Sequence, residues 1–179
     1  MKKLNESIKE LVSENLSDVG FELAKSNIVE RKSGEIVHGI WFQKGTGRLK
    51  GQFTVNVGIR FLFYKDNIGA YPSTFPIGKF SDNKESWYSL KEDEFDKDWQ
   101  NVADIIIQKI IPYFDDLNNL QDMIQACENK KYKSYQIFGS DDGWRNFNLA
   151  FAYYEIGNSE KALDYLKKAE EVVSRNDFP

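Results

Sequence analysis

Residues 52–63 read Gln52-Phe-Thr-Val-Asn-Val-Gly-Ile-Arg-Phe-Leu-Phe63, and this stretch decides the fold. From Phe53 to Phe61 a large apolar residue stands at every second position, with polar or small residues between them. Successive side chains of a β-strand point to opposite faces of a sheet, so this alternation predicts a strand with one apolar and one polar face. The apolar face needs a cover, which the rest of the chain has to supply.

Two further strands are predicted before this one, over Ile28-Val29 and over Ile36–Phe42. The turn residues Ser33-Gly34 and Gly45-Thr46-Gly47 separate the three runs and are typical of hairpins. A fourth strand is expected around Trp87–Leu90. Together these segments predict an antiparallel meander of three to four strands.

Helices are predicted both before and after these strands along the chain. Residues 3–19 repeat apolar side chains at helical spacing up to Gly20, so we expect an amphipathic helix that covers the apolar face of the sheet. A second helix is expected from 95 to 111 and should end at Pro112. Residues 64–90 form a long connection, and connections of this length are commonly functional.

The remainder of the chain is predicted to be helical. One helix is expected over 117–128, followed by a pair of helices over 142–173 that is joined at Gly157. The fold class is therefore α+β. We expect an α+β domain over 1–115 and a helical region over 116–179 that packs on it as one compact unit.

Composition restricts the classes of protein to which the chain can belong. Hydrophobic residues make up 41% and aromatic residues 15% of the 179 residues, too much for a disordered protein. A net charge of −4 argues against a general nucleic-acid binder. The apolar runs are too short for a membrane span, and the charged start lacks the apolar segment of a secretion signal. With Cys127 as the single cysteine, these features indicate a cytoplasmic protein.

Catalytic and cofactor motifs are weak in this chain. The glycines of Gly45–Gly51 lie between two predicted strands, whereas a phosphate loop leads from a strand into a helix, so we interpret them as a hairpin turn. His38 is the only histidine, and we expect it at the core or at a sheet edge. Cys127 is expected to be a buried structural thiol. We therefore expect no catalytic residues, no metal and no cofactor.

Candidate binding residues come from the sheet and from an acidic run. If the polar face of the strand over 52–63 is open, Asn56 and Arg60 belong to an exposed platform. Trp87 and Tyr88 either add aromatic anchors of the kind that is common at interfaces or simply cap the core. The acidic run would steer a basic partner through Asp93, Glu94, Asp96 and Asp98.

The segment Asn148–Ala169 resembles one tetratricopeptide repeat. Small residues stand where two helices approach closely, at Ala150, Ala162 and Ala169, and Gly157 stands at the turn. The resemblance implies that Leu149, Tyr153 and Leu166 pack between the two helices. Because repeat arrays need about three units to bury a continuous core, one copy implies a contact module and not a solenoid.

Residues 4–115 resemble a bacterial family that is catalogued only as a domain of unknown function. The motifs that carry this resemblance are Val19-Gly-Phe21, Ile40-Trp-Phe-Gln-Lys44 and Phe53-Thr-Val-Asn-Val-Gly-Ile59. The family has no established activity, but small α+β proteins of this type often lie beside bacterial toxin genes as candidate immunity proteins. The resemblance implies a function of that kind and assigns no site.

Three functions follow from these observations. The first is a non-catalytic protein-binding protein, specifically a bacterial immunity protein that occludes a basic toxin domain. The second is a structural or regulatory scaffold module in which the helical pair docks on other helices. The third is a small-molecule enzyme with a site under the 64–90 connection. The oligomeric state stays open at this point.

Overall fold

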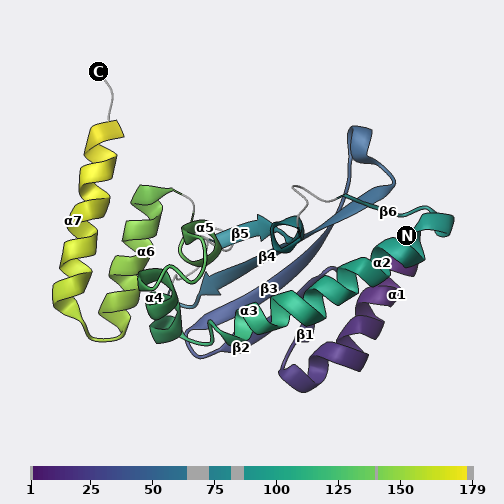
Figure 1. Ribbon diagram of the computed structural model, residues 1–179, viewed down its shortest axis with the longest axis horizontal. Helices are drawn as coiled ribbons and strands as arrows, with labels where there is room; N and C mark the ends of the chain where they lie inside the picture. The colour runs from purple at the N-terminus through teal and green to yellow at the C-terminus, as the bar shows by residue number, and fades with distance from the viewer. Residues whose placement is uncertain (1, 64–72, 82–86, 140, 177–179) are drawn as a thin grey trace. The chain divides into compact units, whose positions relative to one another are not determined.

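The computed structural model describes residues 2–63, 73–81, 87–139 and 141–176, and it confirms the α+β class (Figure 1). The chain divides into two compact units, each of which is described by itself. The first unit comprises Met1–Ser33, Val37–Gly58 and Phe75–Asp115. The second comprises Gly34–Ile36, Ile59–Thr74 and Asp116–Pro179.

The strands form one antiparallel sheet in the order β1-β2-β3-β4-β5, and β6 also pairs with β4. Consecutive strands are therefore neighbours, which confirms the predicted meander. The strands are β1 (Glu22–Lys25), β2 (Ile28–Ser33), β3 (Ile36–Lys44), β4 (Gln52–Phe61), β5 (Ser73–Pro76) and β6 (Tyr88–Ser89). The sequence did not predict β1 and β5, and the predicted fourth strand is the two-residue β6.

Two predicted features of the N-terminal half are confirmed. The helix expected over 3–19 is α1 (Lys2–Leu11), followed by the π-helical turn η1 (Val12–Leu16) and the 3₁₀ turn η2 (Ser17–Val19). It ends at Gly20, whose φ of 85° is left-handed. Residues 45–51 join β3 to β4 as a turn that contains η3 (Gly47–Leu49), and the N–H of Gly45 donates to the carbonyl of Gln52 at 2.9 Å.

The helix expected to end at Pro112 continues past it, so that prediction is wrong. The segment consists of α2 (Glu92–Ile105), the π-helical turn η5 (Ile106–Ile110) and α3 (Ile111–Asp115). Proline normally breaks a helix because it cannot donate a hydrogen bond to the carbonyl four residues earlier. The π-helical turn already departs from that hydrogen-bond pattern just before Pro112, so the missing N–H is tolerated there.

Aromatic side chains of α2 and α3 cover one face of the first unit's sheet. The Trp99 ring lies 5.7 Å from Phe42 and 6.3 Å from Phe53, and α3 adds Phe114, which stacks on His38 at 4.4 Å. The first helix lies beside α2, because Lys3 Nζ is 2.7 Å from Asp96 Oδ1. The cover of the sheet is therefore supplied by α2 and α3 as well as by the predicted first helix.

The second unit contains the remaining helices, α4 (Leu120–Glu128), α5 (Ser134–Ile137), α6 (Asp142–Glu155) and α7 (Ser159–Asn176). They confirm the predicted helices over 117–128 and 142–173, whereas α5 was not predicted. Phe61 stacks on Phe138 at 5.7 Å, and buried Asn148 donates from Nδ2 to the carbonyl of Phe138 at 2.8 Å. Within the described ranges, every helix is too short or too polar to cross a membrane.

Candidate protein-binding surface

The second unit presents α6 and α7 as an antiparallel pair with well-defined ends. Asp141 caps α6 by accepting from the N–H of Trp144 at 3.0 Å, and Asn158 caps α7 by accepting from the N–H of Lys161 at 3.1 Å. Between them, Gly157 adopts the left-handed φ of 80°. Its N–H donates to the carbonyl of Tyr154 at 2.9 Å, so the two helices meet in a short, hydrogen-bonded turn.

Small side chains allow the two helices to lie close together, as the sequence predicted. The buried residues of the pair include Leu149, Ala150, Tyr153, Ala162 and Ala169. The expectation that Leu166 also packs between the helices is wrong, because 44% of its surface is exposed. The apolar surface of α7 therefore extends beyond its contact with α6.

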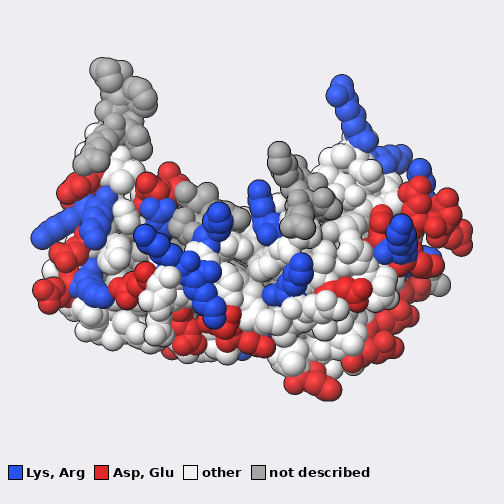
Figure 2. Space-filling view, in the orientation of Figure 1, with Lys and Arg blue, Asp and Glu red and all other residues white. Residues whose placement is uncertain are grey.

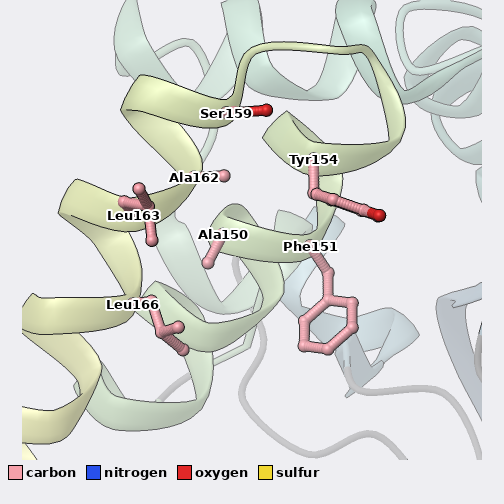
Figure 3. Close-up of a pocket in the computed structure, with 7 residues that line it drawn as sticks. All are labelled: Ala150, Phe151, Tyr154, Ser159, Ala162, Leu163 and Leu166. Carbon is pink, nitrogen blue, oxygen red and sulfur yellow. The ribbon is translucent and has the colours of Figure 1, made fainter.

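Large apolar side chains are exposed on this helical pair. The exposed fraction is 56% for Trp144, 65% for Tyr154 and 57% for Leu163. A groove of about 390 Å³ runs between the helices and is almost wholly apolar (Figure 3). We call this depression the α6–α7 groove. The residues that line it are Ala150, Phe151, Tyr154, Ser159, Ala162, Leu163 and Leu166. Clustered exposed apolar side chains of this kind are typical of interaction surfaces.

A row of rings supports the α6 side of the groove. Trp144, Phe147 and Phe151 follow one another along the helix, with ring centroids 5.8 Å and 4.8 Å apart. Phe151 also stacks on Phe63, with the rings 5.8 Å apart and nearly parallel. The groove wall is therefore held by aromatic packing within the second unit and is already formed without a bound partner.

A polar cluster fixes the pair to α4. Lys161 Nζ donates to Glu128 Oε1 at 2.8 Å and to the Tyr153 hydroxyl at 3.2 Å, and that hydroxyl donates to Glu128. The hydrogen bond from Lys161 lowers the pKa of Glu128, and the hydrogen bond to Glu128 raises the pKa of Lys161. Burial and the bond to Glu128 raise the pKa of Tyr153 to about 12. These groups stay in one charge state near neutral pH and act as a structural tie, not as an acid and base pair.

The predicted platform on β4 is largely covered. Thr54 and Gly58 on the polar side of this strand are buried, so the strand does not present an open polar face. Asn56 is half-buried and donates from Nδ2 to Gln43 Oε1 at 3.3 Å. Arg60 is half-buried as well. β4 lies between β3 and β5 inside the sheet, and alternation along one strand does not predict how exposed its second face is.

The two predicted aromatic anchors differ in exposure. Trp87 is half-buried, and Tyr88 is a core side chain that packs on Phe53 at 5.5 Å through the pairing of β6 with β4. Of the two alternatives for Tyr88, the exposed anchor is therefore wrong, and its buried position agrees with the cap of the core. Residues 64–72 and 82–86 of the long connection, under which an enzyme site was considered, lie outside the described residues.

The predicted acidic residues have different roles in the first unit. Asp93, Glu94 and Asp96 are exposed in the first turns of α2, although Asp96 also pairs with Lys3. Asp98 is half-buried, where its carboxylate accepts from the N–H of Ser89 at 2.6 Å and so fixes β6 against α2. Figure 2 shows that acidic side chains gather over the region of α1 and α2. Three of the four residues therefore belong to an acidic surface, and the fourth has a structural contact.

His38 and Cys127 are the two residues that the sequence offers for metal or nucleophilic chemistry, and neither is fully exposed. His38 is fully buried in the first unit, where its Nδ1 accepts from Arg31 Nε at 3.2 Å. Cys127 is half-buried in the second unit, and burial raises the pKa of its thiol, which disfavours the reactive thiolate. Among the described residues, no group of three or more His, Cys, Asp or Glu side chains is placed to hold a metal ion.

The exposure of Trp144, Tyr154 and Leu163 was not predicted from the sequence. For Leu163 a signal is present in the sequence, because α7 carries apolar residues on two stripes. Ala162, Tyr165 and Ala169 follow the spacing of one stripe, whereas Leu163 and Leu166 lie on another. A helix that packs on a single partner needs only one stripe, so the second indicates a further contact.

No family model matches this chain, and no curated protein or solved structure matches it either. The resemblances to the tetratricopeptide repeat and to the bacterial domain of unknown function therefore stay predictions. The candidate site rests on the geometry of α6 and α7.

Proposed function

We propose that this chain is a non-catalytic, cytoplasmic protein-binding protein that binds its partner through the α6–α7 groove. The observation that carries the proposal is the groove itself, an apolar depression with Tyr154, Leu163 and Leu166 exposed along it. Burying large aromatic and aliphatic side chains supplies most of the binding energy of protein interfaces. A preformed groove also lowers the entropy that is lost on binding.

Site-specific photo-cross-linking in cells tests this proposal. A benzoylphenylalanine in place of Leu163 should cross-link to one discrete protein, and excess unlabelled wild-type chain should compete with the cross-link. The competitor with Leu163→Glu and Leu166→Glu should not compete, because charged side chains in an apolar groove oppose desolvation. The matched control places the cross-linker at Leu49, which is 38% exposed in the β3–β4 turn of the first unit.

The opposite pattern of cross-links would refute a groove-dependent function. Equal capture of the same proteins from positions 163 and 49, or equal competition by the wild type and the double variant, would show that the groove does not select a partner. The three substituted positions, 163, 166 and 49, are solvent-exposed, so the variants should fold. Circular dichroism of each variant checks this.

A narrower form of the proposal is that the partner is a bacterial toxin domain and that this chain neutralises it. The acidic surface of the first unit favours a basic partner, because exposed Asp93, Glu94 and Asp96 would accelerate its association. Co-expression with the product of a neighbouring toxin-like gene should restore growth. Asp93→Lys with Glu94→Lys should slow association at low salt while leaving dissociation nearly unchanged, and growth that co-expression leaves unchanged would contradict neutralisation.

A further inference from the structure

We propose that the α6–α7 groove receives a single amphipathic helix of a partner protein, with basic side chains along the edges of that helix's apolar stripe. This inference rests on the proposed function and specifies the chemistry of the partner. It is supported by the shape of the groove, the area that it exposes and the charges beside it.

The shape of the groove suits a third helix. Ala150 and Ala162 lie between the two helices, and Leu163 and Leu166 stand along α7 (Figure 3). Small residues between larger ones allow side chains of another helix to enter the depression. On α7 the lining runs from Ser159 to Leu166, about 10 Å at 1.5 Å per residue. That length matches two turns of a bound helix, which presents apolar side chains at i, i+3 or i+4, and i+7.

The exposed area favours one helix over a second copy of this chain. Tyr154, Leu163 and Leu166 are each about half exposed, so together they offer roughly 300 Å² when a fully exposed large side chain offers about 150–250 Å². A stable dimer buries about 800 Å² on each partner. The groove alone therefore falls well short of a stable homodimer interface, whereas a single bound helix needs less area.

The charges beside the groove favour basic side chains on that helix. Glu160 lies three residues before Leu163 and Glu170 lies four residues after Leu166, so both share the exposed side of α7 with the groove. Among the side chains that the structure describes, the other exposed charged residues on this flank are Asp164, Lys167 and Glu171, with Glu155 at the end of α6. Carboxylates therefore predominate beside the apolar strip.

Two lysines of α7 lie on its other side and do not neutralise this flank. Lys161 bonds Glu128 at 2.8 Å, and Lys168 Nζ lies 4.3 Å from the centre of the Tyr165 ring. Tyr165 itself stacks on Tyr153 of α6, on the side where the two helices pack. An acidic flank beside an apolar groove is complementary to a basic amphipathic helix.

The test uses the full chain, labelled with ¹⁵N, and three synthetic peptides of equal length. The first carries leucines at helical spacing with lysines beside them, and the second has glutamate in place of each lysine. The third has the composition of the first in an order that spreads the leucines around the helix. We expect the first peptide to bind at least tenfold more tightly than the second at low salt, with amide shifts confined to α6 and α7. High salt should reduce the difference, and the third peptide should not bind.

Variants of the chain complete the test. Leu163→Glu should lower the affinity of the chain for the first peptide at least tenfold. Leu49→Glu changes the matched exposed leucine of the first unit and should leave that affinity unchanged. Equal affinity of the basic and acidic peptides, or shifts outside α6 and α7, would overturn the inference. So would concentration-dependent dimerisation of the free chain that Leu163→Glu abolishes, because it would assign the groove to a second copy.

The two proposals can fail separately. A partner that cross-links at position 163 in cells, together with no binding of the basic peptide, would leave the protein-binding function intact and reject the helix. Loss of the groove-dependent cross-link would reject the function itself, whatever the peptides do.

Discussion

Arg31 joins several parts of the first unit. From β2 its guanidinium donates to His38 Nδ1 at 3.2 Å, to the carbonyl of Val19 at 3.3 Å and to Asp115 at 2.7 Å. The same group lies over the ring of Phe21 at 4.8 Å. The Arg31 side chain is 10% exposed, whereas the side chain of Asp115 is 51% exposed, so the ion pair lies at the edge of the buried region. Arg31 thereby connects β2 and β3 to the ends of η2 and α3.

Replacing Arg31 with alanine should lower the free energy of unfolding by about 2–3 kcal/mol, because His38 Nδ1 and the Val19 carbonyl lose their donor and the Phe21 ring loses its cover. Arg48→Ala is the matched control, since Arg48 is exposed in the β3–β4 turn and should change stability by less than about 0.5 kcal/mol. Urea unfolding of both variants, followed by circular dichroism, measures the difference. Equal stability of the two variants would contradict a structural role for Arg31.

The sequence placed His38 at the core or at a sheet edge, and the structure shows that it lies in the core. Its partner Arg31 was not predicted. Alternation along a strand tells which side chains share a face, but it does not tell which residue of the next strand lies opposite. Pairs of this kind depend on register, which the turns and the packed helices set together.

At the scale of elements, the predictions held where a segment carries its own periodic pattern. The strand over 52–61 and the helical pair over 142–173 have such patterns and were found. The missed strands β1 and β5 have four residues each, too few for a clear alternation. β1 consists of Glu22–Lys25, and three of its four residues are exposed. Such short strands form because a neighbouring strand offers hydrogen bonds, and a local pattern cannot show that.

The turn between α6 and α7 gives a prediction at this scale. Gly157 has a φ of 80°, and no atom lies within 4 Å of the position that a Cβ would take. Gly157→Ala should therefore cost about 1 kcal/mol through backbone strain alone. Asparagine tolerates the left-handed region better, so Gly157→Asn should cost less. Thermal unfolding of the two variants compares them, and an alanine variant at least as stable as the asparagine variant would show that the turn can relax.

For the whole molecule, the exposed surface is harder to predict from the sequence than the helices and strands are. The acidic run was predicted from the charged residues in the sequence, and Asp93, Glu94 and Asp96 of this run are exposed. The α6–α7 groove was harder to find because its residues resemble ordinary core residues in the sequence. Leu163 and Leu166 become distinctive only once the partners of each helix face are known. Exposure is a property of the folded chain, and it decides which apolar residues are available for binding.

The response of the molecule to acid depends on two similar clusters in the second unit. Glu128 is bound by Lys161 and Tyr153, and Asp116 by Lys131 and Tyr132. The hydrogen bonds from the lysines, aided by those from the tyrosines, lower the pKa of both carboxylates in the folded state. A carboxylate whose pKa is lower in the folded than in the unfolded chain stabilises the fold above its unfolded pKa, and this stabilisation is lost as the pH falls through the folded value.

For Glu128 the unfolded value is 4.5, so its contribution should be complete at neutral pH and should decrease as the pH falls below about 4.5. Glu128→Gln removes the titrating group and should lower the melting temperature at pH 7, with the difference from wild type shrinking toward pH 3. Glu155→Gln, at an exposed position of α6, is the control, and its melting temperature should differ from that of the wild type by the same amount at every pH. Thermal unfolding at pH 7, 5, 4 and 3 tests this. A deficit of Glu128→Gln that stays the same at pH 3 would mean that the side chain stabilises the second unit through packing and neutral hydrogen bonds, not through its charge.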